Sequence, residues 1–330
     1  MSSSTTSHCR LDAITWRGFD ALMLENAFLR AVVVPALGGK ITSLVDLKSG
    51  REWLWRHAHA PVEAPRYGDD FVPRHDTGGF VECFPSHAST YYPTGPWAGT
   101  PVPDHGEIWS LPWRVDQFCD GAAVELRMAV HGVRFPYRFE RVLLMTADAP
   151  SLRLAYTVTN LAPMPFPFLW NAHPVFQVSP GTRLMLPLRE LTLSAGDARF
   201  GKFGRTLEWP EPTDESGESW DFATLPGADS RVLLELFARS PQLGYVALQD
   251  PALGCELRMQ FDPAEVTHLG VVLNLGGGST AGAATGDYNL VIAPSVGAPG
   301  DLATSYRHLG ETGELPASGR VAWQLELVMR

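Results

Sequence analysis

The stretch Leu152-Arg-Leu-Ala-Tyr-Thr-Val-Thr159 alternates apolar and polar residues along most of its length. Because successive side chains of a β-strand point to opposite faces, this period of two predicts a strand with one face on a core. The same pattern recurs in four other segments, Glu125–Val130, Arg138–Leu143, Glu256–Phe261 and Val321–Leu327. The 31 glycines and 27 prolines of the chain supply turns between such strands. The pattern predicts an all-β protein, built as a large antiparallel sandwich, with one short helix at Asp301–Arg307.

The size of the chain suits one large β domain. Its 330 residues can bury a sizeable core, and 45% hydrophobic against 19% charged residues is typical of a folded protein. We expect a disordered, Ser/Thr-rich N-terminus over residues 1–10 and a single domain over residues 11–330. Two long aperiodic stretches, Arg56–Trp97 and Asp197–Asp221, predict loops, and the aromatic residues and histidines of the first suggest that it binds a ligand.

Charge and cysteine usage exclude several classes of partner. A net charge of −10 argues against nucleic acid and anionic membranes as partners, because both repel an acidic protein at long range. No apolar run is long enough to span a membrane or to serve as a signal peptide. The four cysteines stand far apart, which predicts reduced thiols. We therefore expect a cytoplasmic monomer or homodimer.

Two histidines lie in aromatic, turn-rich segments, Pro103–Trp109 and Phe168–Phe176. His105 in the first is four residues from Trp109, and His173 in the second is three residues from Trp170. Imidazole exchanges protons near neutral pH, and an indole ring stacks on the apolar face of a pyranose. These two segments indicate a sugar-binding site.

Five segments in chain order resemble the aldose 1-epimerase (galactose mutarotase-like) family: Asn26–Leu44, Gly78–Pro85, the His105 and His173 segments, and Asn274–Gly277 together with Ala293–Leu302. The resemblance implies a β-supersandwich that holds a free sugar. It also implies the interconversion of anomers, in which an acid and a base open and reclose the sugar ring.

Carried over to this sequence, the resemblance implies that His173 is the general acid and that His105 positions the substrate. The family's glutamate base falls at Ala293, which cannot accept a proton. A mutarotase would then need another carboxylate, and we take Glu82 as the catalytic candidate. The other candidates that remain open are Asp76, Asp104, Glu107 and Asp287.

Substrate-binding residues are expected in the same segments. Phe80 and the two tryptophans could stack on a sugar ring, while the guanidinium of Arg74 offers paired donors to hydroxyl or phosphate oxygens. The predicted set is Arg74, Asp76, Phe80, Glu107, Trp109, Trp170, Asn171 and Asn274.

We expect no metal and no other cofactor. His57 and His59, drawn together with His75 and His87, have no cysteine or carboxylate at metal-ligand spacing. Three functions remain open. The chain could be an anomer-interconverting isomerase, a non-catalytic carbohydrate-binding protein that Ala293 favours, or an enzyme acting on a phosphorylated, acidic or keto sugar.

Overall fold

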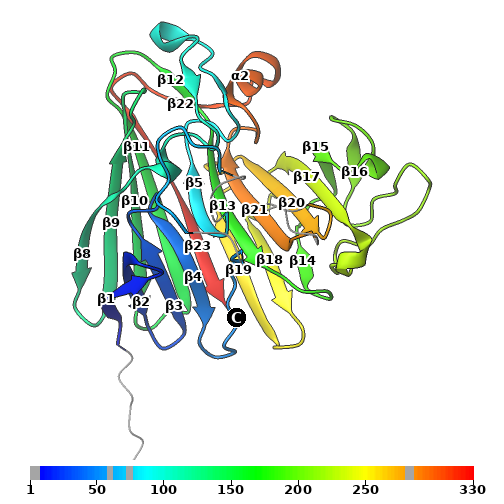
Figure 1. Ribbon diagram of the computed structural model, residues 1–330, viewed down its shortest axis with the longest axis horizontal. Helices are drawn as coiled ribbons and strands as arrows, with labels where there is room; N and C mark the ends of the chain where they lie inside the picture. Colours follow the sequence, from blue (N-terminus) through cyan, green and yellow to red (C-terminus); the bar gives the residue numbers. More distant parts are fainter. Residues whose placement is uncertain (1–7, 58–61, 72–76, 279–285) are drawn as a thin grey trace, which may run out of the picture.

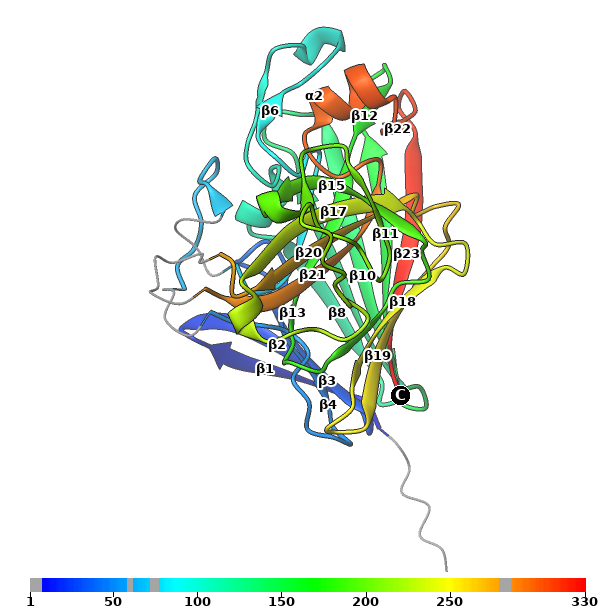
Figure 2. The ribbon, with the colours of Figure 1, turned by 90° about the vertical axis from the view of Figure 1, so that its right-hand side faces the viewer.

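Two large antiparallel β-sheets face each other in the computed structural model, which describes residues 8–57, 62–71, 77–278 and 286–330 (Figures 1 and 2). The eleven strands of the first sheet are, in spatial order, β1 (Arg10–Trp16), β2 (Phe19–Glu25), β3 (Leu29–Val34), β4 (Lys40–Asp46), β5 (Gly79–Cys83), β13 (Trp170–Gln177), β21 (Tyr288–Val296), β20 (His268–Leu275), β17 (Val232–Arg239), β15 (Glu190–Gly196) and β16 (Thr206–Glu208).

The second sheet has eight strands, in the order β14 (Arg183–Met185), β18 (Tyr245–Asp250), β19 (Cys255–Phe261), β23 (Arg320–Met329), β11 (Ser151–Asn160), β10 (Tyr137–Thr146), β9 (Ala123–His131) and β8 (Arg114–Cys119). Two small pairs, β12 (Phe166–Phe168) with β22 (Gly313–Leu315) and β6 (Thr90–Tyr91) with β7 (Pro101–Val102), complete the sheets. The predicted all-β sandwich is confirmed.

Helical structure in the described residues is limited to single turns: η1 (Gly95–Trp97), η2 (Ile108–Ser110), η3 (Ala198–Phe200), η4 (Ala228–Ser230), α2 (Leu302–Thr304) and η5 (Ser305–Leu309). The expected helix is present as α2 and η5, and the Asp301 carboxylate caps its start by accepting a hydrogen bond from the Thr304 amide. None of the helices that the structure describes has the length and hydropathy to cross a bilayer.

The five alternating segments all fall in the eight-stranded sheet, in β9, β10, β11, β19 and β23. In contrast, β5, β13, β20 and β21 at the centre of the other sheet are buried on almost every residue. A strand covered on both faces has no reason to alternate, and so periodicity did not find these strands. β5 in particular lies inside the stretch predicted as a loop.

Regular structure is already present before the predicted domain boundary at residue 11. Cys9 is buried, its amide donates to the carbonyl of Gly121, and β1 begins at Arg10. Residues 1–7 lie outside the described part of the chain.

A buried ion pair joins the two sheets. Arg141 on β10 donates to the carboxylate of Glu82 on β5 at 2.9 Å, and both side chains are 0% exposed. Tyr156 and Trp170 donate to the same carboxylate at 2.9 and 3.0 Å. Arg141 also donates to the Gly39 carbonyl and lies over the Trp113 ring. Polar groups from four strands therefore fix how the two sheets face each other.

Replacing Arg141 with methionine should lower the free energy of unfolding by about 3–5 kcal/mol, because it leaves the Glu82 charge buried without its partner. Arg141→Met/Glu82→Gln should recover part of this loss, since the amide carries no charge. Urea unfolding followed by tryptophan fluorescence measures both effects. Arg127→Met, which removes an exposed pair with Glu125, is the control and should cost about 1 kcal/mol or less. An equal loss in the single and double variants would contradict the argument.

Candidate functional site

His105 has an unusual, left-handed backbone conformation in a tightly paired segment. Its φ of 57° is in the left-handed region, which non-glycine residues seldom adopt, and such strain concentrates at functional sites. The next residue, Gly106, forms a parallel bridge with Phe84, and a Cβ at Gly106 would lie 2.2 Å from the Phe84 carbonyl oxygen. The His105 amide donates to the carbonyl of His87 at 2.7 Å. Segments 84–87 and 103–107 are therefore locked side by side.

His173 reaches the same place from β13. The register of β13 and β21 pairs Asn171 with Ser295, which puts His173, two residues on, opposite Ala293. Residues that are directly opposite in a sheet share a face, and so do residues two apart. Asn171, His173 and Ala293 therefore lie on one face of the eleven-stranded sheet, turned away from the interior of the sandwich.

Three imidazole rings meet on this face. The ring centroids of His105 and His173 are 5.3 Å apart, those of His87 and His105 4.7 Å, and those of His87 and His173 5.6 Å. Phe71 packs against His105 at 4.3 Å and against His173 at 5.8 Å. His105 and His173, which the sequence placed in separate segments, are thus direct neighbours, and His87 joins them.

Asp104 orients His105. An Asp104 carboxylate oxygen lies 3.0 Å from Nδ1 of His105, and the other oxygen accepts the Phe71 amide at 3.0 Å. Burial alone would raise the pKa of Asp104, but the His105 imidazole and the Phe71 amide outweigh it and keep this pKa below the usual range. Asp104 therefore stays ionised beside the histidine ring.

The other two histidines are held neutral at neutral pH. Burial, followed by the charge of His105, lowers the pKa of His87 to about 3. Burial and the neighbouring His105 and His87 likewise hold the pKa of His173 well below its usual value. Among the described residues, Nε2 of His87, Nδ1 of His173 and Oδ1 of Asn171 are buried without a hydrogen-bond partner. Buried polar atoms without partners are costly, so these three are the groups that a ligand would satisfy.

A small cavity of about 60 Å³ opens beside these groups. Its polar lining consists of His87, Asn171, His173, Ser194 and Glu235. Ala293 and Gly270, which pair across β21 and β20, form part of its apolar wall, and a Cβ at Gly270 would lie 3.4 Å from Cγ of Pro299. A sugar ring is larger than this cavity and would extend out of it.

Glu235 is the carboxylate that sequence reasoning missed. It lies on β17, three strands from His173 across β21 and β20, which corresponds to about 14 Å between the two backbones. The side chain is exposed at the edge of the cavity, yet the protein around it desolvates the carboxyl and raises its pKa, an effect that the charge of His105 partly offsets. In the sequence, Glu235 occupies the polar position of an alternating strand, where a solvated residue is the usual interpretation.

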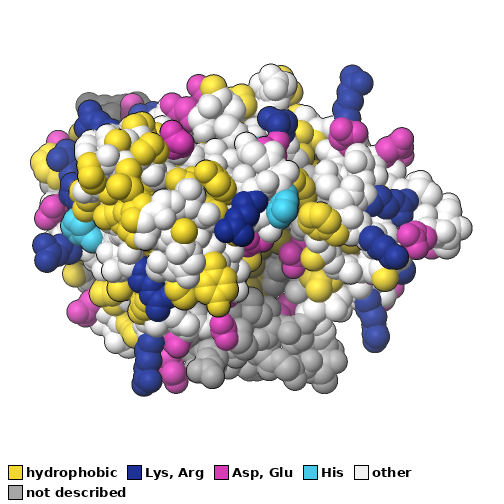
Figure 3. All heavy atoms as spheres, turned by 90° about the horizontal axis from the view of Figure 1, so that it is seen from above, with side chains coloured by type: hydrophobic (Ala, Val, Ile, Leu, Met, Phe, Trp, Pro, Cys, Tyr) yellow, Lys and Arg dark blue, Asp and Glu magenta, His cyan; other side chains and the backbone are white. Residues whose placement is uncertain are grey.

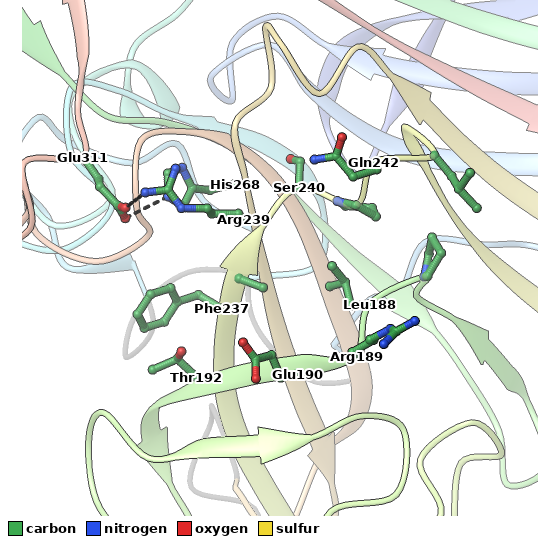
Figure 4. Close-up of a pocket in the computed structure, with 14 residues that line it drawn as sticks. Leu188, Arg189, Glu190, Thr192, Phe237, Arg239, Ser240, Gln242, His268 and Glu311 are labelled. Carbon is green, nitrogen blue, oxygen red and sulfur yellow. Dashed lines mark hydrogen bonds and ion pairs between the residues drawn. The ribbon is translucent and has the colours of Figure 1, made fainter.

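A larger open hollow of about 510 Å³ is lined by residues of β15, β17 and β20 (Figure 4). Phe237 in its wall pairs with Gly270, so both hollows lie on the same face of the sheet. Arg239 and His268 both point to the carboxylate of Glu311, with His268 Nε2 at 2.9 Å. Acidic and basic side chains are also interspersed over the molecule seen from above (Figure 3).

Comparison with known proteins finds a family model that matches part of the chain and solved structures with a similar fold. Residues 93–199 match the model of the aldose 1-epimerase family, a range that contains both His105 and His173. The fold is similar to a galactose mutarotase-like protein from Lactobacillus casei (18% identity, TM-score 0.65, 94% of this chain and 100% of that one). It is also similar to a galactose mutarotase-like protein from Clostridium acetobutylicum (13% identity, TM-score 0.66, 98% and 99%).

The resemblance to the aldose 1-epimerase family is confirmed. A TPR-domain containing protein from Parabacteroides distasonis is similar as well (14% identity, TM-score 0.66), but 94% of this chain covers only 47% of it, so the chain spans about half of that protein's length. No curated protein matches the sequence.

The sequence analysis took Glu82 as the candidate to replace the base missing at Ala293, but the structure places Glu82 away from the cavity. Glu82 pairs with Ala172 and therefore lies on the opposite face of the sheet from His173. Burial raises its pKa, while Arg141, Tyr156 and Trp170 oppose this by bonding to the carboxylate. A carboxylate enclosed in this way cannot reach a sugar beside His173. Trp170, predicted to bind substrate, donates its indole N–H to Glu82 and therefore also lies away from the cavity.

Glu107, predicted as a substrate-binding residue, is also buried away from the cavity. It is 0% exposed, and its carboxylate accepts hydrogen bonds from the hydroxyls of Tyr67 and Tyr137 at 2.7 and 2.8 Å. The amides of Arg134 and Val133 donate to it at 2.9 and 3.3 Å. Glu107 therefore ties η2 to the turn between β9 and β10.

The other predicted sugar contacts are distributed as follows. Phe80 pairs with Pro174 and packs in the core between the sheets, and Asn274 exchanges hydrogen bonds with Gly278 in a turn. Trp109 donates to the Asp104 carbonyl at 2.8 Å and packs on Phe71, which places it next to the histidines. Asn171 lines the cavity, whereas Arg74 and Asp76 lie outside the described residues.

Glu107→Gln should lower the free energy of unfolding by about 1–3 kcal/mol, because an amide cannot accept from four donors at once. Sugar binding should remain, since the side chain lies away from the cavity. Thermal unfolding and a ligand-binding titration would check the two expectations, with the exposed Glu314→Gln as control. Loss of sugar binding at unchanged stability would instead mean that Glu107 binds the sugar.

Proposed function

We propose that this protein binds a free sugar in the histidine-lined cavity and interconverts its anomers, with His173 and Glu235 as the acid/base pair. The observation that carries the proposal is that the side chains of His173 and Glu235 line one cavity on the same face of the sheet. The family match over residues 93–199 supports the same reaction class.

The chemistry needs two groups on two sides of a ring. One group takes the proton of the C1 hydroxyl while the other gives a proton to the ring oxygen, and the C1–O5 bond breaks. Rotation about the C1–C2 bond exposes the other face of the aldehyde. Ring closure then returns both protons in reverse, so His173 and Glu235 exchange roles and no net proton is consumed.

Glu235 is the best carboxylate for this role because the alternatives are occupied. Glu82 and Glu107 are each 0% exposed and bound by several donors. Ala293, at the family's base position, lies in an apolar patch with Val175 and Val291. In contrast, Glu235 lines the cavity and remains exposed enough to exchange protons.

Three further groups would hold the sugar in place. Oδ1 of Asn171 is buried without a partner, and Ser194 lines the cavity on the side of Glu235. His105, fixed by Asp104, lies 5.3 Å from His173 between ring centroids and would position a hydroxyl. Each is a donor or acceptor suited to sugar hydroxyls.

A sugar-binding protein without the reaction is the second candidate. The apolar patch around Ala293 favours it, because the position at which the family has its base offers only methyl groups here. The polar lining of the cavity would serve this function equally well.

We also propose a cytoplasmic location, supported by the four cysteines, all of which are free thiols. A monomer or homodimer remains our prediction for the assembly.

Saturation-transfer NMR on free aldoses, uronic acids and sugar phosphates should detect anomer exchange with the wild-type protein. Glu235→Gln and His173→Ala should each slow this exchange by about a hundredfold or more, because each removes one proton carrier. His105→Ala should mainly weaken binding. Glu208→Gln, an exposed glutamate on β16, is the control. No exchange with persistent line broadening of the sugar would favour the binding protein, and full activity of Glu235→Gln would remove this residue from the reaction.

Ala293→Glu in the Glu235→Gln background should restore part of the exchange rate, because it returns a carboxylate to the position opposite His173. Ala293→Gln in the same background has nearly the same size but no base, and it should stay slow. The same NMR experiment compares the two. Equal rates in both would mean that position 293 does not face the reacting hydroxyl.

A further inference from the structure

The three-histidine face contains a set of ligand atoms that the sequence did not reveal. The sulfur of Cys83 and one ring nitrogen each of His87 and His105 lie within 4.8 Å of one another. Cys83 and His87 are four residues apart, a spacing common among metal ligands, whereas His105 is brought in by the fold. Of the four histidines that the sequence analysis drew together, His87 belongs to this set, His57 lies 3.7 Å from Asp287, and His59 and His75 are outside the described residues.

The backbone holds these three residues in place before any ligand arrives. Cys83 ends β5, and its pairing with Asn171 turns its side chain to the same face as His173. The hydrogen bond from the His105 amide to the His87 carbonyl then ties the two histidine segments together. A site of this kind is preorganised, because its ligands sit on paired segments and not on a free loop.

The side-chain environment is that of a metal site. Nε2 of His87 is buried and has no hydrogen-bond partner among the described residues, and the side chain of Cys83 is 0% exposed. Asp104 lies 3.0 Å from Nδ1 of His105. A carboxylate on one ring nitrogen commonly orients a histidine that binds metal through the other.

We propose that Cys83, His87 and His105 bind one divalent transition-metal ion of the zinc type. One sulfur and two imidazole nitrogens suit Zn²⁺ or Co²⁺, whereas Mg²⁺ and Ca²⁺ prefer oxygen ligands. On binding, Cys83 releases its proton to solvent and a thiolate–metal bond forms. Ligand atoms in a tetrahedral site stand about 3.5 Å apart. Side-chain movements of about one ångström would bring the three ligand atoms to this spacing.

Three protein ligands leave the fourth position of the ion open to water. His87 belongs to both the metal set and the lining of the cavity, so that open position would border the proposed sugar site. The metal site does not depend on the proposed isomerase activity, because its ligands are defined by their own geometry. The two hypotheses can therefore fail separately.

Cobalt titration tests the site directly. Tag-free protein treated with a chelator and then titrated with Co²⁺, without sugar, should bind one equivalent and develop a near-ultraviolet thiolate-to-cobalt band. Cys83→Ala should lose this band, and His87→Gln should bind at least tenfold more weakly. Asp104→Asn should weaken binding by about 10–100-fold, because it removes the carboxylate that orients His105.

Two matched controls use residues of the same type elsewhere. Cys255→Ala removes another buried free thiol, and His131→Ala removes an exposed histidine, so both should bind Co²⁺ like wild type. Near-ultraviolet circular dichroism checks that each variant is folded. A wild-type protein that binds no Co²⁺, or a folded Cys83→Ala variant that keeps the band, would overturn the proposal. Anomer exchange is measured in a separate experiment, so its absence would leave the cobalt result standing.

Discussion

The ion pair between Arg141 and Glu82 is the constraint on which the site depends. It bridges the two sheets without any solvent exposure, and the indole of Trp170 shares the carboxylate. A slip of one residue in the pairing of β5 or β13 would turn Glu82 out of the core and His173 into it. Since an unpaired buried charge is far costlier than a lost surface contact, such a slip is strongly disfavoured. The polar core thus fixes which residues of β13 face the cavity.

In the proposed reaction, the cavity would take its proton donor and its proton acceptor from two separate strands. Ring opening requires a proton donor and a proton acceptor on two sides of a sugar, and it does not specify which strand supplies each. Here the position opposite His173 carries a methyl group in an apolar patch, whereas the carboxylate lies on β17.

Sequence patterns found one sheet and missed the centre of the other for a single reason. The alternating strands each have one face on the core and one toward solvent, whereas β5, β13, β20 and β21 are covered on both faces. The same limitation affected the carboxylates. Glu82 and Glu107 stand beside recognisable motifs, but their partners Arg141 and Tyr137 come from distant strands that the sequence does not connect to them.

The sequence by itself determined the all-β class, the two histidine segments, the family resemblance and the alanine at position 293, because each is a property of consecutive residues. Only the tertiary structure decided that Glu235 faces the cavity, that Glu82 does not, and that Cys83 approaches His87 and His105. The physical reason is that strand pairing is long-range. Alternation tells which residues share a face, but the partner strand and the packing of the two sheets decide what that face meets.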